Sequence, residues 1–153
     1  MGEIFGKMYC FLFEDFFGLN LAEYLWGGVS PYSENNSYIG LGLAMLGITA
    51  ALVVLFYYII DHPKLNTWWG WLIFLGGNAV INFFVGWQMV LSDYHGGKMV
   101  ETDPATGSDV PLDITTSNIL CFGVADMLLA IFWFAVFSFA FKWWSKNCSH
   151  APA

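Results

Sequence analysis

The chain has 153 residues, of which 58% are hydrophobic, 20% are aromatic and only 11% are charged, with a net charge of −7. A soluble domain is usually about a quarter charged, so this composition predicts a membrane protein. Arginine is absent and the five lysines are scattered, which excludes a nucleic-acid-binding surface because such a surface needs clustered basic side chains.

Residues 1–36 are predicted to form an interfacial amphipathic segment and a linker. A membrane span over 8–26 would bury Glu14 and Asp15 near its middle, where each carboxylate costs roughly 2.5–3.5 kcal/mol. On a helix, one stripe would be polar or small, formed by Glu3, Lys7, Cys10, Glu14 and Gly18. Apolar side chains fill most of the remaining surface, which is typical of a helix lying along a membrane interface. Either lipid or a protein surface, from this chain or a partner, could cover that apolar side.

Three apolar runs are long enough to cross a bilayer as helices, because about 20 residues span its hydrocarbon core. They cover approximately 38–60, 68–91 and 118–141. With the connecting loops they form a predicted three-helix membrane domain over 37–146, followed by a short tail over 147–153. The expected fold class is therefore an all-α membrane protein with three transmembrane helices and an interfacial N-terminal helix.

The lysines predict how these helices are oriented, because cytoplasmic loops carry the basic excess. Lys64, Lys142 and Lys146 fall on one side of the predicted bundle, whereas Lys7 and Lys98 fall on the other. This pattern predicts the N-terminus outside and the C-terminus inside a cytoplasmic or plasma membrane.

The outer loop over 92–117 is predicted to contain a short β-hairpin. Alternating residues flank the sequence "DPATG", in which proline and glycine favour a turn. Its acidic side chains do not match the spacing of a calcium-binding loop. We interpret them as a solvated acidic cap.

Polar residues occur in all three apolar runs at a similar predicted depth. At 1.5 Å per residue, Asp126 lies roughly 12 Å from the outer end of its helix, Asn82 roughly 13 Å and Thr49 roughly 16 Å, with Asn78 one turn below Asn82. This agreement predicts a polar cluster in which Asp126 accepts hydrogen bonds from Asn82, Asn78 or Thr49. Two alternatives are an ion or proton path and a contact with a basic residue of a partner span.

Small residues and tryptophans indicate packing surfaces and a membrane interface. Small residues let transmembrane helices approach closely. The candidate packing positions are Gly40, Ala44, Gly47, Ala51, Gly77, Gly86 and Gly123. An aromatic belt at the inner interface is predicted from Trp68, Trp69, Trp71, Trp143 and Trp144.

No sequence motif indicates catalysis, a metal or a cofactor. The chain lacks a P-loop, HExxH and GxSxG. All three histidines lie outside the apolar runs, which disfavours a haem within the bilayer. The pairs Asp93–His95 and Asp61–His62 are interpreted as ordinary polar residues at loop ends.

The sequence therefore favours a non-catalytic subunit of a larger membrane assembly, with the lipid bilayer and other membrane subunits or copies of itself as partners. The first alternative is a homo-oligomeric cation channel that uses a ring of Asp126, Asn82 and Asn78. A membrane protective protein that binds a toxin or another partner is a third, narrower hypothesis.

Overall fold

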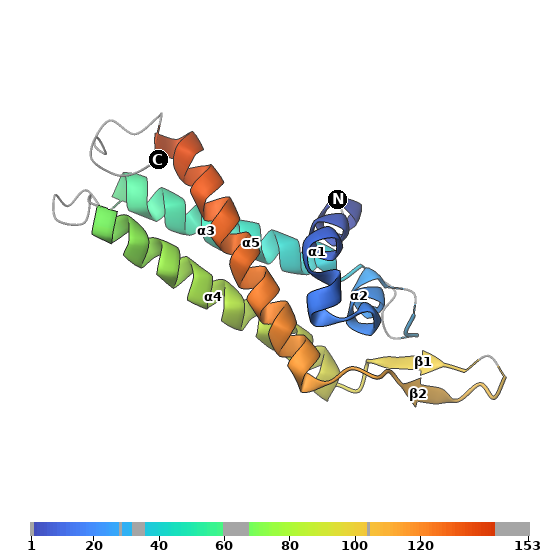
Figure 1. Ribbon diagram of the computed structural model, residues 1–153. Coiled ribbons are helices and arrows are strands. Elements are labelled where there is room, and N and C mark those ends of the chain that lie inside the picture. The colour runs from blue at the N-terminus through green and yellow to red at the C-terminus, as the bar shows by residue number, and fades with distance from the viewer. Residues whose placement is uncertain (1, 28, 32–35, 60–67, 104, 143–153) are drawn as a thin grey trace.

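The computed structural model describes residues 2–27, 29–31, 36–59, 68–103 and 105–142, and these are mostly helical (Figure 1). Two short helices come first, α1 over Gly2–Phe17 and α2 over Leu19–Trp26. Three long elements follow, α3 over Tyr38–Val54 with a π-helical extension over Leu55–Ile59, α4 over Trp68–His95 and α5 over Thr116–Lys142. Between α4 and α5 lie two short strands, β1 over Val100–Thr102 and β2 over Asp109–Pro111.

Within the described residues, three helical stretches are long and apolar enough to cross a membrane: Tyr38–Tyr58, Trp68–His95 and Thr116–Lys142. All three predicted runs are thus helical, but the second continues four residues beyond its predicted end at residue 91. Gly97 has a φ of 67°, and the amides of Gly96 and Lys98 donate to the carbonyls of Ser92 and Asp93. A glycine in the left-handed region lets the last carbonyls of a helix be hydrogen-bonded. Helix α4 can therefore continue through the polar residues after Leu91 and end at His95.

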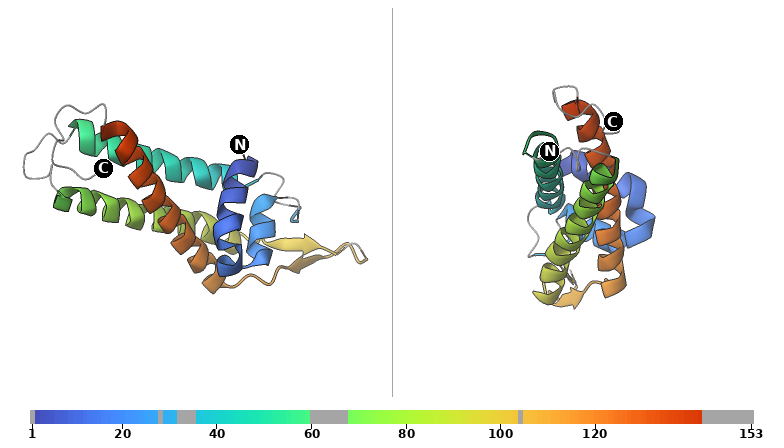
Figure 2. Two further views of the ribbon diagram at one scale, coloured as in Figure 1. Left: turned by 45° about the horizontal axis from the view of Figure 1, so that its top comes forward. Right: turned by 90° about the vertical axis from the view of Figure 1, so that its left-hand side faces the viewer.

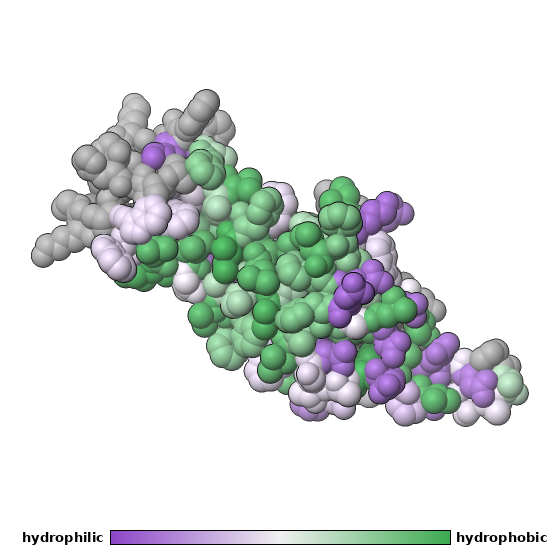
Figure 3. Space-filling view, in the orientation of Figure 1, coloured by the Kyte–Doolittle hydropathy of each residue, from purple (hydrophilic) through white to green (hydrophobic). Residues whose placement is uncertain are grey.

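The long helices form a bundle in which α4 and α5 make the most extensive contact, and α3 packs on both. Helices α1 and α2 stand across one end of this bundle, beside the β-hairpin (Figure 2). The opposite end holds the last turns of α3 and α5 and the start of α4. Figure 3 shows hydrophobic side chains over the long helices and hydrophilic ones gathered near α1 and the hairpin.

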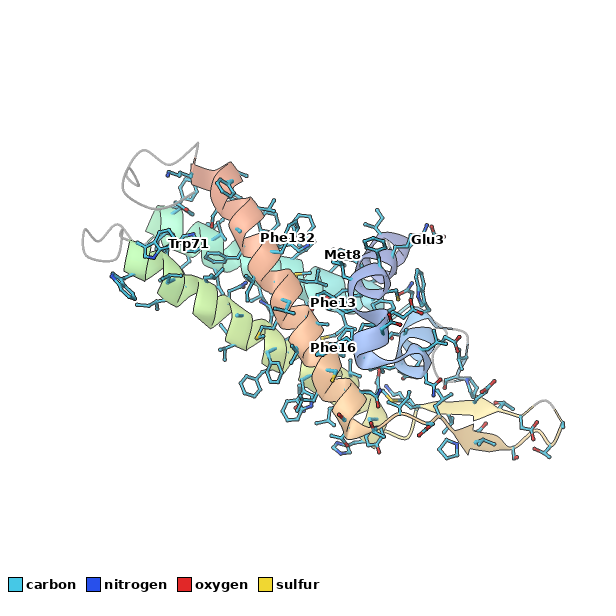
Figure 4. The ribbon with its side chains drawn as sticks, viewed as in Figure 1. Glu3, Met8, Phe13, Phe16, Trp71 and Phe132 are labelled. Atoms are coloured by element: carbon cyan, nitrogen blue, oxygen red, sulfur yellow. The ribbon has the colours of Figure 1, made fainter. Side chains whose placement is uncertain are left out.

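Part of the apolar side of α1 is covered by the long helices of the same chain. Phe5 is 8% exposed, while Tyr9 and Phe17 are fully buried, and all three belong to the main hydrophobic core. Met8 and Phe13 pack against this core, whereas Glu3 points away from the long helices (Figure 4). Protein packing therefore covers part of the apolar surface of α1, whereas Leu12 and Phe16 are 54% and 50% exposed. Ile4 and Phe11 remain exposed on the other side.

The predicted hairpin is confirmed as a two-stranded antiparallel sheet that pairs Val100 with Pro111 and Thr102 with Asp109. The Asp103 carboxylate closes its turn by accepting hydrogen bonds from the amide of Ala105 at 2.9 Å and the hydroxyl of Thr106 at 2.8 Å. These two bonds lower the pKa of Asp103, because they stabilise the ionised carboxylate.

One small-residue stripe does not pack inside the bundle as expected. Gly40, Gly47 and Ala51 are exposed and Ala44 is half-buried. Helix α3 instead turns a different side inward, formed by Leu41, Gly42, Met45, Thr49 and Val53. This buried side of α3 packs against α5, α4 and α1.

Candidate functional site

Asp126 lies near the middle of α5, is 2% exposed and faces Gly86 of α4. A Cβ atom at Gly86 would lie 2.7 Å from Oδ2 of Asp126 and 3.0 Å from its Cβ. Glycine at this position therefore provides the space that the carboxyl group occupies. Gly123, one turn earlier on α5, similarly allows contact with Phe83 and Trp87 of α4.

The hydrogen-bond donor to Asp126 is Tyr9 of α1, whose hydroxyl donates to Oδ1. The Tyr9 ring is fully buried and stacks on Tyr38 and Phe122, with ring centroids 5.5 Å and 5.4 Å away. Burial and the neighbouring Asp126 raise the pKa of Tyr9 well above its ordinary value. The phenol consequently stays protonated at neutral pH and remains a donor.

The two asparagines of α4 form a separate hydrogen-bonded unit. Asn78 donates through Nδ2 to the carbonyl oxygen of Ala130 at 3.0 Å, and Asn82 donates to the carbonyl and Oδ1 of Asn78 at 2.9 and 3.0 Å. Thr49 is also fully buried, but its hydroxyl and Oδ1 of Asn82 have no hydrogen-bond partner within the described residues. The structure thus buries all four predicted polar residues, but Asn82, Asn78 and Thr49 are not the donors to Asp126.

The predicted depth of Asn82 is wrong because α4 ends at His95 and not at residue 91. With α4 ending at His95, Asn82 lies roughly 20 Å along the helix from that end and Gly86 roughly 14 Å. Asp126 lies roughly 15 Å from the start of α5 at Thr116. Gly86 is therefore the residue of α4 at the level of Asp126, as the contact between them also shows.

A second tyrosine–aspartate pair holds α2 against α4. Tyr24 is 1% exposed, and burial together with a hydrogen bond to Asp93 raises its pKa above the ordinary value. Asp93 also binds Nζ of Lys98 at 2.9 Å. Asp93, interpreted from the sequence as an ordinary polar residue at a loop end, therefore lies within α4 and has two partners. Within the described part of the chain, no group of three or more histidine, cysteine or acidic residues could hold a metal ion.

Further polar contacts join the N-terminal helices to the rest of the chain. Asn118 of α5 donates through Nδ2 to the carbonyl of Phe17 at 2.9 Å, where α1 ends. Gly18, with a φ of 96°, then redirects the chain into α2. Asn20 of α2 donates to the carbonyl of Asp113 at 3.2 Å. These contacts make α1 and α2 an integral part of the folded structure.

The described tryptophans of the predicted belt lie at the end of the bundle opposite α1, where Figure 4 labels Trp71. Trp68 and Trp69 are 54% and 74% exposed, whereas Trp71 donates through Nε1 to the Ser138 hydroxyl at 3.2 Å. Trp143 and Trp144 lie outside the described residues.

The residue that the sequence analysis missed is Tyr9. Helical periodicity does place Tyr9 on the apolar side of α1, opposite the polar stripe, where a side chain is expected to be buried. Protein-family models, curated proteins and solved structures give no match to this chain. The site itself, a buried carboxylate closed by a tyrosine of the same chain, is suited to holding helices together.

Proposed function

We propose that the chain is an integral membrane protein that serves as a non-catalytic subunit of a larger membrane assembly. The length and apolar character of α3, α4 and α5 support insertion in a membrane. The lysine distribution supports the hairpin end outside and the end of α5 inside. In this orientation the acidic hairpin lies outside, and α1 and α2 lie in the outer half of the bundle.

The observation that carries the assembly proposal is the outward-facing stripe of α3. Gly47 and Ala51 are exposed, and a Cβ atom at Gly47 would meet nothing within 4 Å. Within a bilayer, such small residues let a second helix approach closely and gain van der Waals contact. A transmembrane helix of a partner subunit is the ligand that fits this stripe.

The burial of Asp126 supports the subunit proposal over the cation channel. A ring of carboxylates in a pore requires side chains that face an aqueous axis between chains. Asp126 is 2% exposed in one chain and bound to Tyr9, while Asn78 and Asn82 are fully buried. A toxin-binding protective protein would be one special case of partner binding.

Native mass spectrometry after gentle extraction from the native membrane tests the proposal. We expect the wild-type chain to co-purify with other membrane subunits, and Gly47→Phe to lose them because the ring would fill the stripe. Gly77→Phe is the matched control, since Gly77 is also exposed with nothing within 4 Å of a Cβ but lies on α4. A bare wild-type monomer would contradict the proposal, and a homo-oligomer of defined size would favour the channel.

A further inference from the structure

A groove of about 760 Å³ opens between the end of α2, the start of α3 and the end of α4. Its volume falls within the roughly 300–1,000 Å³ of typical small-molecule sites. One part of its lining is polar, formed by Asn36, Ser37, Gln88, Ser92 and Asp93. The remainder is apolar, formed by side chains such as Ile39, Leu41, Met89 and Val90. A ligand that fits both parts must have a polar end and an apolar end.

The apolar part continues along α4. A second hollow of about 400 Å³ is lined by Phe84, Val85, Gln88 and Met89, and it shares the last two residues with the groove. Measured from His95, Asp93 lies roughly 3 Å along the helix and Phe84 roughly 16 Å. Polarity thus falls along α4 from its end toward its middle, over a distance that suits part of an acyl chain.

The polar part adjoins two opposite charges. Asp93 lines the groove, and Nζ of Lys98 lies 2.9 Å from its Oδ1. Lys98 is half-exposed, so its ammonium group can contact a ligand as well as Asp93. This pair complements a zwitterion, whose cation would lie near the carboxylate and whose phosphate would lie near the lysine.

We infer that this groove binds one phospholipid with an ethanolamine headgroup. The primary ammonium donates hydrogen bonds to oxygen atoms of Asp93, Gln88 or Ser92, and one acyl chain follows Met89 toward Phe84. The inference rests on the membrane placement proposed above, because that placement puts the polar part at the outer interface. It does not depend on a partner subunit.

Gly40 offers a way to close the groove without changing any charge. It lies in the lining and is exposed, and a Cβ atom there would be 3.8 Å from Cε of Met89. Gly40→Phe would therefore fill the groove with a ring. Gly47→Phe is the matched control, because it makes the same change two turns along the same helix at a position outside the lining.

The experiment uses the full-length chain in detergent, delipidated and then titrated with palmitoyl-oleoyl phosphatidylethanolamine or phosphatidylglycerol under native mass spectrometry. We expect one ethanolamine lipid per wild-type chain, bound about tenfold more tightly than the glycerol lipid, which is ~1.4 kcal/mol. Gly40→Phe should lose this lipid and Gly47→Phe should retain it. Thermal unfolding of both variants shows whether each is folded.

Any of three lipid-binding results would overturn the inference: no stoichiometric lipid on the wild type, equal binding by folded Gly40→Phe, or equal affinity for both headgroups. A dimer that Gly40→Phe converts to monomer would also overturn it, since the groove would then be an interface between copies. Recovery of the chain from carbonate-washed membranes tests the membrane placement separately. A chain that stays in the membrane but binds no lipid would refute only the groove, whereas a chain released by carbonate would refute the placement.

Discussion

Replacing Tyr9 with phenylalanine removes one oxygen atom and tests the contact that joins α1 to α5. The stacking of the ring on Tyr38 and Phe122 is retained, so the change isolates the hydrogen bond. Asp126 is 2% exposed and has little access to water that could replace the lost donor. Leaving a buried partner unsatisfied costs about 1–3 kcal/mol, and more when it is charged. We therefore expect Tyr9→Phe to lower the free energy of unfolding by ~1–3 kcal/mol.

A double-mutant cycle separates this hydrogen bond from packing effects. Asp126→Asn keeps an oxygen acceptor for Tyr9, whereas Asp126→Leu removes it. Tyr9→Phe should therefore remain costly beside asparagine and become neutral or stabilising beside leucine, where the buried hydroxyl has lost its acceptor, with a coupling energy of at least ~1–3 kcal/mol. The measurement is reversible unfolding in dodecyl maltoside by titration with sodium dodecyl sulfate, followed by circular dichroism.

Two results would refute this reasoning. A loss below ~0.5 kcal/mol for Tyr9→Phe in the wild-type background would match an ordinary surface substitution. An equal loss in the wild-type and leucine backgrounds would mean that the hydroxyl acts elsewhere. Hydrogen exchange along α1 provides a second readout, since weakening the contact should increase exchange over Gly2–Phe17 more than over the middle of α4.

Three further predictions follow from close contacts and from Tyr9. Gly86→Ala should destabilise by ~1–3 kcal/mol because its methyl group would overlap Asp126, whereas Gly77→Ala, with open space around it, should be neutral or slightly stabilising in the same unfolding titration. Gly42→Ala should speed proteolysis of α1, because its Cβ would meet the Phe5 ring and weaken the packing of α1 on α3. Gly47→Ala is the control and should leave the rate of proteolysis unchanged, because its Cβ would meet nothing within 4 Å. The pKa of Tyr9 is raised in the fold, so its contribution to stability is complete below about pH 10 and is lost as pH rises toward the folded pKa, at up to ~1.4 kcal/mol per pH unit. Because the pKa of Tyr24 is raised too, the stability of Tyr9→Phe should still fall at alkaline pH, but less steeply than that of the wild type.

The long helices and the hairpin could be predicted because each depends on local sequence. A run of about 20 apolar residues has few alternatives to a helix that crosses a bilayer, and proline and glycine in "DPATG" indicate a turn without tertiary information. The end of α4 was harder to predict. Ser92–His95 looks like a loop by composition, but the left-handed Gly97 allows the helix to continue through it.

The donor to Asp126 could not be predicted from periodicity within the apolar runs. The donor does not belong to the three long helices but to α1, which lies across them. The predicted end of α4 at residue 91 is about one helical turn short of its end at His95. That error put Asn82, rather than Gly86, at the expected level of the carboxylate. Hydrogen bonding is specific over about 3 Å, so an error of ~6 Å in register changes the partner completely.

The same docking of α1 explains which side of α3 faces inward. The ring of Phe5 lies so close to Gly42 that a Cβ atom there would overlap it, so the glycine gives α1 the space to pack against α3. Tyr9 follows one turn later on α1 and reaches Asp126. Without α1, the bundle would expose both the hollow at Gly42 and a polar carboxyl group, and in lipid the latter carries a large free-energy cost. The buried carboxylate and the N-terminal helix therefore depend on each other, and the stripe around Gly47 is the side of α3 that remains for another protein.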